Sequence, residues 1–412
     1  KEEFVLIVFI ISDIYQSSKF CYNKMKWEDV KNSEGFKNIS FMGIATIGGN
    51  AISGLFWLYL GNLMGEENYG EIAFLLSIGG ITMSIVIWGS EKALMVYTAK
   101  GLNIQPPIYI ISIITTGIGT IILFVIFNNI GLSFYVLGGV IAQLAVAELL
   151  GRKQFKQYSK FFMLQKILFV TVALGLYFVL GPIGILLGFG LSCLIYAQRI
   201  YKTIKETEID FGLIKKKSEF IINNYIVDLS GQVGNQIDRL LIGPIFGFAL
   251  LGNYFLAIQI LNVLVILPEV VAQYTIPHDA SGNSTKKIKI LTVGTAIGLA
   301  IIVIFTAPIL LPTLFPEYEE AVLLVPIIAV AIIPITISYQ YISKFLGVEK
   351  TRIVLISYFI EIIILIPGII ILGEMMGIIG LGIIFVFSTV AKAIFLAIMD
   401  NFLKYQNISK TD

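Results

Sequence analysis

Residues 220–246 read FIINNYIVDLSGQVGNQIDRLLIGPIF, a run long enough to cross a bilayer as a helix. A hydrocarbon core about 30 Å thick needs roughly 20 helical residues. Polar side chains recur in this run at intervals of three or four, which places them on one helix face. They are Asn224, Asp228, Gln232, Asn235 and Arg239. We therefore predict a membrane-spanning helix that carries a single polar stripe.

The rest of the chain is strongly apolar. Of its 412 residues, 57% are hydrophobic and 14% are charged, against about 25% charged residues in soluble domains. Apolar runs of spanning length predict an all-α integral membrane protein with twelve transmembrane helices. The first six are Ile39–Leu63, Ile72–Trp88, Ile108–Phe127, Leu132–Leu150, Phe161–Leu180 and Ile183–Ile200. The second six are Phe220–Phe246, Leu251–Gln273, Ile290–Leu311, Ala321–Tyr341, Ile353–Leu372 and Ile378–Ala397.

The connecting loops predict the orientation, because Lys and Arg accumulate on the cytoplasmic side of a membrane. Loops 61–71, 128–131, 180–183, 247–252, 312–320 and 373–377 contain neither residue. The alternate connections are basic and include Lys92, Arg152, Lys205, Lys287 and Lys350. We therefore expect a multi-pass protein of the cell membrane with both termini in the cytoplasm.

An internal repeat relates the two groups of helices. A shift of 182 residues places a series of four glycines onto a second series: Gly49, Gly61, Gly65 and Gly70 fall on Gly231, Gly243, Gly247 and Gly252. The first and seventh helices then run in the same direction, so the repeats are parallel, and a substrate path is expected between two lobes. We predict lobes at 36–200 and 220–400, a basic linker at 201–219, a polar or interfacial segment at 1–35 and a cytoplasmic tail at 401–412.

The repeat also transfers the polar stripe to the first helix. The same shift maps Asp228, Gln232, Asn235 and Arg239 onto Thr46, Asn50, Ser53 and Trp57. Polar residues that only hold two helices together are usually one or two in number, and each interhelical hydrogen bond contributes about 0.6–2 kcal/mol. A longer stripe with an acid and an arginine, which are costly at mid-depth, favours a hydrated cavity. These nine residues, with Asn224 included, are the predicted substrate-cavity set.

Three further ionisable residues lie within predicted spans. Glu361 sits mid-helix and is a candidate for the cavity or for proton coupling, or else a structural acid satisfied by a partner. Lys166 and Lys392 lie about two turns from the cytoplasmic ends, where their stems could snorkel or face the cavity. No catalytic residue, metal site or cofactor is predicted, and no nucleic-acid partner.

Two stretches resemble a known family. The segment from Asp238 to Ala257, which contains the residues 238–243 DRLLIG and Leu251-Gly252-Asn253-Tyr254, is similar to the seventh-helix signature of polysaccharide-transport (Wzx-type) oligosaccharide flippases. These belong to the multidrug/oligosaccharidyl-lipid/polysaccharide (MOP) superfamily. The stretch from Leu63 to Glu71 resembles the end of their first helix. The similarity extends over roughly residues 36–400.

The resemblance implies two six-helix lobes that form a V around a central cavity. It implies that polyisoprenyl-pyrophosphate-linked oligosaccharides are moved from the cytoplasmic to the external leaflet, alongside glycosyltransferases or a polymerase of the same pathway. Arg239 would then hold the pyrophosphate, since a guanidinium pairs with phosphate in a bidentate way. Amides of Gln232, Asn235 and Asn50, with the ring of Trp57, would suit the sugar.

The chain lacks the two extra helices and the additional cavity arginines expected of peptidoglycan-precursor flippases, so that subgroup is disfavoured. A cation-coupled multidrug exporter of the same superfamily is the main alternative, with Asp228 or Glu361 as the coupling acid. An integral-membrane enzyme of polysaccharide assembly is a remote alternative, because the longest predicted external loop holds only about ten residues.

Overall fold

The computed structural model describes residues 34–280, 286–347 and 350–408, and this part of the chain is almost wholly helical with no strand. The segment expected at 1–35 lies almost entirely outside the described residues. The elements are α3 (Glu34–Ile87), α4 (Ser90–Ala99), α5 (Gln105–Phe127), α6 (Ile130–Gly151), α7 (Phe155–Leu180), α8 (Ile183–Cys193), η1 (Leu194–Tyr196), α9 (Ala197–Glu206), α10 (Phe211–Gly234), α11 (Ile237–Phe246), α12 (Phe248–Ala280), α13 (Lys286–Leu314), α14 (Glu319–Ala329), α15 (Ile332–Gly347) and α16 (Thr351–Ile408).

Each of the twelve predicted spans falls on helical structure in the described residues, although three of them are divided between separate helices: α8 to α9, α10 with α11, and α14 with α15. Helices α3 and α16 each contain two spans, since a non-helical glycine divides them, Gly65 in α3 and Gly377 in α16. Within the described part of the chain, eight helices are long and apolar enough to cross a membrane, and a ninth span forms if the pair α14 and α15, bent by 45°, is taken as one. The predicted seventh span, α10 with α11, is too polar to be recognised by hydropathy alone.

The glycines matched by the repeat adopt matching backbone conformations. Gly65 ends the first span with φ 72° and ψ 167°, and Gly247 ends the seventh with φ 97° and ψ 158°. Positive φ is accessible to glycine at no steric cost, which makes it the usual helix terminator. Gly181 and Gly377 likewise share φ of 65° and 58°. The repeat therefore determines where the chain turns back into the membrane.

The two halves meet in a symmetric contact at these turns. A Cβ on Gly70 would lie 1.9 Å from the carbonyl oxygen of Phe248, and a Cβ on Gly252 would lie 1.9 Å from that of Glu66. The shift of 182 residues that relates Gly70 to Gly252 also relates Glu66 to Phe248. The contact is thus self-complementary about a pseudo-two-fold axis, and only glycine allows the backbones this close.

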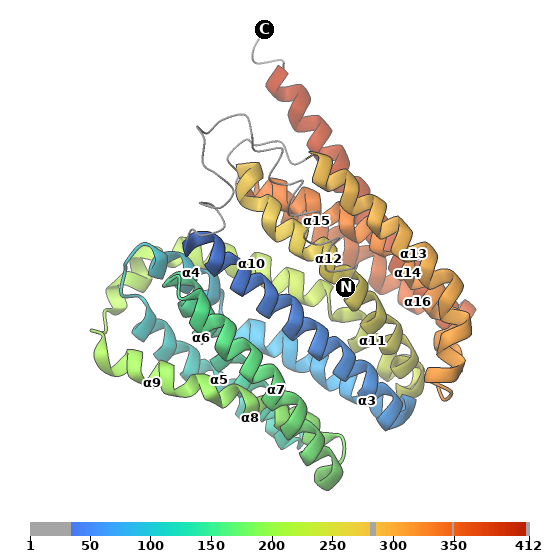
Figure 1. Ribbon diagram of the computed structural model, residues 1–412, viewed down its shortest axis with the longest axis horizontal. Coiled ribbons are helices and arrows are strands. Elements are labelled where there is room, and N and C mark those ends of the chain that lie inside the picture. The colour runs from blue at the N-terminus through green and yellow to red at the C-terminus, as the bar shows by residue number, and fades with distance from the viewer. Residues whose placement is uncertain (1–33, 281–285, 348–349, 409–412) are drawn as a thin grey trace.

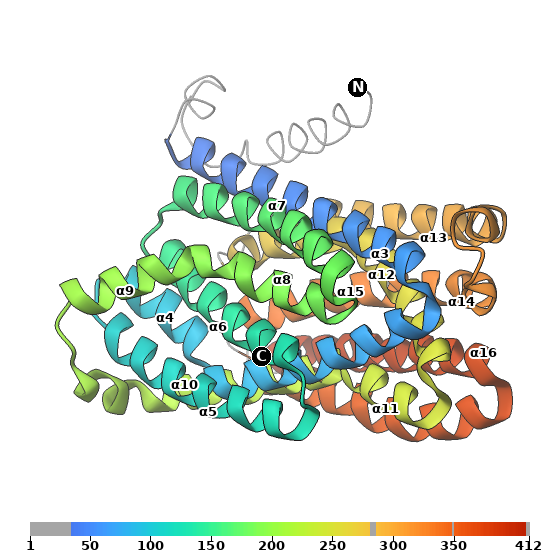
Figure 2. The ribbon, with the colours of Figure 1, turned by 90° about the horizontal axis from the view of Figure 1, so that it is seen from below.

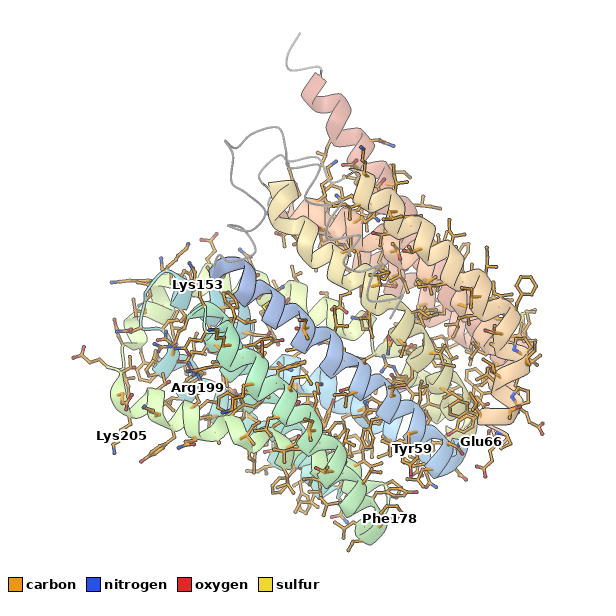
Figure 3. The ribbon with its side chains drawn as sticks, in the orientation of Figure 1. Tyr59, Glu66, Lys153, Phe178, Arg199 and Lys205 are labelled. Carbon is orange, nitrogen blue, oxygen red and sulfur yellow. The ribbon has the colours of Figure 1, made fainter. Side chains whose placement is uncertain are left out.

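The spans form two bundles of helices. In Figure 1, α5–α9 lie on one side of α3, while α12–α16 lie on the other. Figure 2 shows most helices running side by side, with α10 continuing into α11 along one edge. We call the end with the positively charged connections the basic end and the end with Gly65 and Gly247 the glycine end. Figure 3 places Lys153 and Lys205 at the former and Glu66 at the latter.

The chain beyond two predicted span ends is helical. The second span ends at Ile87, within one residue of the predicted Trp88. Lys92, however, was expected in a loop and lies in α4, which begins directly after the positive φ of Trp88 and Gly89. The last predicted span ended at Ala397, whereas α16 continues to Ile408, so much of the expected tail is helical. In both cases the helix extends past the apolar window because backbone hydrogen bonding does not require apolar side chains.

Candidate functional site

The seventh span is broken at mid-course, which corrects the prediction of one continuous polar face. Helix α10 ends at Gly234, Asn235 is its C-cap, and α11 begins only at Ile237. Gly231, Gly234 and Asn235 are weak helix formers, and their clustering favours a break here. Broken membrane helices leave backbone groups unpaired, so they occur where protein or a water-filled cavity satisfies those groups.

Arg239 lies in the first turn of α11, directly after the break. Its Nη2 donates a hydrogen bond to the carbonyl oxygen of Asn235, one of the groups that the break leaves free. Its guanidinium carbon lies 5.8 Å from the ring centroid of Phe255 on α12. The side chain is 14% exposed, and its Nε is buried without a hydrogen-bond partner among the described residues.

Asp238, the neighbour of Arg239, has a different role. One carboxylate oxygen accepts a hydrogen bond from the Tyr254 hydroxyl at 2.8 Å, and the other accepts one from the backbone N–H of Arg239 at 2.8 Å. The second contact satisfies a free N–H group in the first turn of α11, where an acid also opposes the helix dipole favourably. The same oxygen lies 3.5 Å from Nε of Arg239, within ion-pair range but without a hydrogen bond. Asp238 therefore fixes α11 against α12 and orients Arg239.

On the other bundle, Trp57 of α3 approaches the same place. Its ring lies 6.1 Å from Phe255 in a T-shaped contact and 6.1 Å from Phe169 of α7. The Tyr69 hydroxyl donates a hydrogen bond to the Trp57 carbonyl oxygen at 2.9 Å. Phe255 is thus contacted by both Trp57 and Arg239, and the structure brings these two predicted residues together through one ring.

The remaining predicted residues of α3 lie nearer the basic end. The Thr46 hydroxyl is 3.2 Å from that of Tyr158 on α7. Asn50 is half-buried, and the Ser53 hydroxyl oxygen is buried without a partner among the described residues. No hydrogen bond among the described residues joins these side chains to the predicted residues of α10.

On α10 the predicted residues have unequal surroundings. The Asn224 side chain donates to the Phe220 carbonyl oxygen of its own helix, Gln232 is half-buried, and Asn235 is exposed at the break. Sequence reasoning missed Gln236, whose side chain reaches across to α3. A Cβ added to Gly80 would lie 2.4 Å from its Nε2, while its Oε1 is buried without a partner among the described residues.

Asp228 forms an ion pair with Lys92 of α4, so the two bundles are bridged on the basic side of the break. Both side chains are partly exposed, 31% for Asp228 and 42% for Lys92. Glu91, the residue before Lys92, interacts electrostatically with both. The sequence analysis missed Glu91 and Lys92 because it ended the helix at Trp88, although an amphipathic 90–99 segment could have indicated a helical continuation.

Glu361 and Lys392 pair with each other. Lys392 Nζ donates to both carboxylate oxygens, at 2.7 and 2.8 Å, and the side chains are only 8% and 10% exposed. Lys166 lies instead over the Phe162 ring at 5.1 Å, with no carboxylate in ion-pair range among the described residues. Of the three coupling candidates, two form a buried pair within one helical hairpin, and Lys166 stays beside α3.

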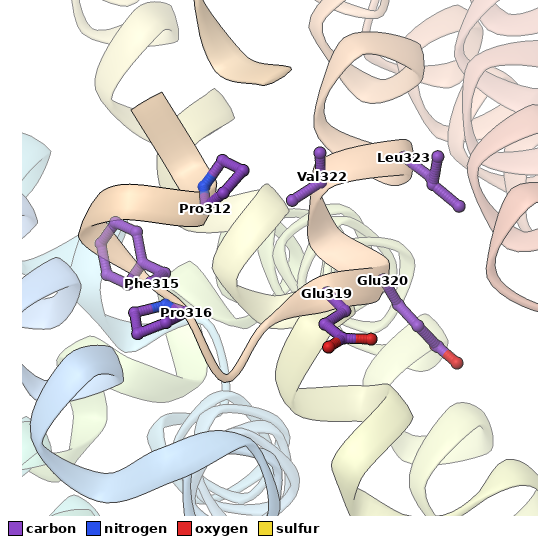
Figure 4. Close-up of a pocket in the computed structure, with 7 residues that line it drawn as sticks. All are labelled: Pro312, Phe315, Pro316, Glu319, Glu320, Val322 and Leu323. Atoms are coloured by element: carbon purple, nitrogen blue, oxygen red, sulfur yellow. The ribbon is translucent and has the colours of Figure 1, made fainter. Parts of the chain in front are cut away.

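Two pockets lie at the glycine end rather than along the predicted path between the bundles. One, of about 480 Å³, is formed at the connection of α13 with α14 and is shown in Figure 4 with Pro312, Phe315 and Glu320. The other, of about 350 Å³, is lined by Glu66, Asn253 and the acidic residues of the same connection. Asn253 donates to Glu66 across the bundles at 2.5 Å. Burial and the Glu66 charge raise the pKa of Glu320 in this acidic connection.

The arrangement around the break has a defined chemistry. It contains one guanidinium, an exposed amide and an indole ring, contributed by both bundles. Buried polar atoms of Ser53, Gln236 and Arg239 lack hydrogen-bond partners among the described residues. Because unsatisfied buried polar atoms are costly, they indicate a place that water or a polar ligand completes.

Comparison with known proteins identifies the fold. No protein-family model matches the chain, and no curated protein matches by sequence. Among solved structures, a lipid II flippase MurJ in an inward closed conformation is similar with a TM-score of 0.73 and 11% identity, over 88% of this chain and 87% of that one. An inward-facing multidrug resistance MATE transporter of the MOP superfamily gives 0.66 and 12%, over 92% and 100%. A MOP transporter from Pyrococcus furiosus gives 0.55 and 11%, over 92% and 98%. The chain therefore has the membrane-spanning, two-bundle fold of MOP-superfamily transporters.

Proposed function

We propose that this chain is a flippase that moves a polyisoprenyl-pyrophosphate-linked oligosaccharide from the cytoplasmic to the external leaflet by alternating access. In this proposal the basic end is cytoplasmic, as the Lys and Arg distribution favours. The protein lies in the cell membrane with both termini inside. The product would supply enzymes that assemble surface polysaccharide, such as glycosyltransferases or a polymerase.

The observation that carries the proposal is the position of Arg239 at the break in the seventh span. A pyrophosphate moving through a low-dielectric environment needs a compensating cation and hydrogen-bond donors. Arg239 supplies both: its Nε lies in ion-pair range of Asp238 but makes no hydrogen bond, and its one side-chain hydrogen bond within the described chain goes to the Asn235 carbonyl. The helix dipole of α11, which begins at the break, adds partial positive charge.

The surrounding side chains suit the sugar. Asn235, whose carbonyl bonds to the arginine, is exposed, and Gln232 one turn earlier on α10 is half-buried, so their amides can exchange water for sugar hydroxyls. Trp57 offers an aromatic face of the kind on which the apolar face of a pyranose packs. Donors and acceptors from Ser53 and Gln236 are buried without partners in the described part of the chain and would be satisfied in the loaded state.

Alternating access needs two sets of contacts that exchange. At the glycine end the bundles are joined by the Gly70 and Gly252 contact and by hydrogen bonds, including Tyr318 to the Gly61 carbonyl at 2.6 Å and Asn62 to the Leu314 carbonyl at 2.9 Å. At the basic end they are joined by side chains of α4 and α10. We propose that release to the outside requires the glycine-end contacts to separate.

A cation-coupled multidrug exporter is the second candidate. The structural likeness to MATE transporters over more than 90% of the chain is compatible with it. Asp228 and Glu91 at the bundle interface would then be the coupling acids. The buried Glu361 is less suited to hold a substrate cation, because Lys392 already neutralises it.

The test is flipping of a fluorescent polyprenyl-pyrophosphate oligosaccharide in proteoliposomes, read by quenching of the fluorophore in the outer leaflet. Arg239→Gln should reduce the rate at least about tenfold, since a charge-assisted pair is lost. Arg239→Lys should be intermediate because the bidentate geometry is lost while the charge remains. Arg352→Gln, which removes an arginine at the basic end, is the matched control and should flip at the wild-type rate.

Two results would count against the flippase. Normal flipping by Arg239→Gln would remove the arginine from the proposed role. A wild-type protein that leaves the lipid unflipped but exports ethidium against a proton or sodium gradient would establish the exporter instead.

A further inference from the structure

Phe255 occupies a position that no sequence signal indicated. It is 1% exposed, lies on α12 near the glycine end, and is contacted by three different helical segments. Its ring lies 4.9 Å from Tyr69, 6.1 Å from Trp57 and 5.8 Å from the guanidinium carbon of Arg239. Tyr69 and Trp57 come from the first bundle, whereas Phe255 and Arg239 come from the second.

The rings around Phe255 extend to the glycine end of the molecule. Tyr69 lies 6.2 Å from Tyr318 in an edge-to-face contact. The hydroxyls of these two tyrosines donate to carbonyl oxygens of α3, Tyr69 to Trp57 and Tyr318 to Gly61. Since Gly65 ends the first span, the Gly61 carbonyl lies in the last helical turn, and the Tyr318 hydrogen bond ties that turn to the second bundle.

We propose that Phe255 is a positioning residue for Arg239. The position of the Arg239 side chain then depends on whether the glycine end is closed. The inference rests on the proposed function and assigns to that site a residue that holds its cation. A guanidinium over an aromatic face is held by the ring quadrupole, and more strongly where water is excluded. The ring stays in place only while Tyr69 and Trp57 pack against it. Separation of the bundles at the glycine end therefore removes one support of Arg239 and weakens its hold on an anion.

This arrangement makes anion binding at Arg239 depend on whether the glycine end is closed or open. With the glycine end closed, Arg239 is held by Phe255 on one side and by the Asn235 carbonyl on another, which pre-organises it for a phosphate group. With the glycine end open, the guanidinium loses the ordered aromatic contact and becomes hydrated. The site thus binds the anionic head group more tightly before opening than after it, as release on the far side requires.

The decisive variant is Phe255→Leu, which keeps an apolar side chain but removes the aromatic face. Phe169→Leu is the matched control. Phe169 is 2% exposed and also lies 6.1 Å from Trp57, but it belongs to the first bundle, and among the described residues the guanidinium of Arg239 lies over Phe255 and not over Phe169. Both substitutions remove the same atoms from a buried aromatic cluster, so a difference between them reports on the arginine.

The first readout does not depend on any substrate. Purified protein is treated with phenylglyoxal, which modifies arginine, and labelling of Arg239 is followed by mass spectrometry. Phe255→Leu should label several-fold faster than both wild type and Phe169→Leu. Equal labelling rates in Phe255→Leu and Phe169→Leu would overturn the positioning role, whatever the protein transports.

The second readout uses the flipping assay. Phe255→Leu should raise the apparent KM for the pyrophosphate-linked oligosaccharide on the order of tenfold, with a smaller change in maximal rate. In an Arg239→Gln background the same substitution should change KM little, since the two residues act together. Additive effects would contradict the inference. If wild type does not flip the lipid at all, the proposed function fails, while the labelling experiment still decides the role of Phe255.

Discussion

Trp57 and Arg239 are equivalent positions in the two halves of the chain, 182 residues apart, and both contact the ring of Phe255. The repeat thus carries an aromatic residue on one side and a cation on the other. If the two halves carried the same side chains, they would present two similar surfaces to a ligand. In this chain the glycines repeat between the halves, but the side chains at the site differ. Such a site suits an asymmetric ligand with a charged and an apolar part.

The first prediction concerns the backbone contact at the glycine end. Gly70→Ala or Gly252→Ala would place a methyl group within 1.9 Å of a carbonyl oxygen, so the bundles cannot close as they do here. We expect the open form to gain population about fivefold or more, since an overpacked contact costs about 1–3 kcal/mol. The check is labelling of Leu256→Cys with a water-soluble maleimide, because Leu256 of α12 is buried against Gly61 of α3 in the closed form.

The control for this prediction is Gly175→Ala, because a Cβ there would meet nothing within 4 Å. It should leave labelling of the cysteine unchanged. Unchanged labelling in Gly70→Ala as well would show that the glycine contact is not what closes this end.

A second prediction concerns the ion pair that bridges the bundles at the basic end. Lys92→Asp should place two like charges together and separate α4 from α10, and Asp228→Lys should do the same. The double exchange should restore the contact. Because both side chains are partly exposed, the pair contributes only about 0.2–1 kcal/mol and weakens with salt. Labelling of Tyr97→Cys with a water-soluble maleimide measures the separation, because Tyr97 of α4 is buried and packs against Phe220 of α10. A double exchange that labels as readily as the single variants would argue against a direct pair.

Much of the fold was predictable because it is determined by local signals. Apolar length placed the spans, and the glycine spacing located the turns at Gly65 and Gly247, where the structure shows positive φ. The break at Asn235 was not predicted. Polar residues spaced at intervals of three or four look the same in the sequence whether the helix is continuous or briefly interrupted. The helical continuation at Glu91 was missed because a hydropathy window ends where charged residues begin.

The candidate site was predictable in part. The repeat paired Trp57 with Arg239 as equivalent positions, and both contact the ring of Phe255. Phe255 gave no signal, because an apolar residue in an apolar helix is unremarkable until its neighbours are known. The partners of Asp228 and Glu361 also depend on how distant helices pack, which composition and spacing do not contain.

The last prediction concerns the buried pair of Glu361 and Lys392. Glu361→Gln would leave an ammonium group unpaired in the second bundle, and Lys392→Met would leave a carboxylate unpaired. Removing one partner of a buried pair typically costs about 3–5 kcal/mol, whereas replacing both by neutral groups is often tolerated. Thermal unfolding of the protein in detergent should therefore show a large loss for each single variant and near-recovery for Glu361→Gln with Lys392→Met.

Flipping by that double variant separates the two roles open to the pair. If the pair only stabilises the hairpin of α16, the double variant should fold and flip at close to the wild-type rate. If Glu361 exchanges a proton during the cycle, the double variant should be stable yet slow, and its rate should lose any dependence on a proton gradient that the wild type has. A double variant as unstable as either single one would contradict direct pairing, because no charge would then remain to explain the loss.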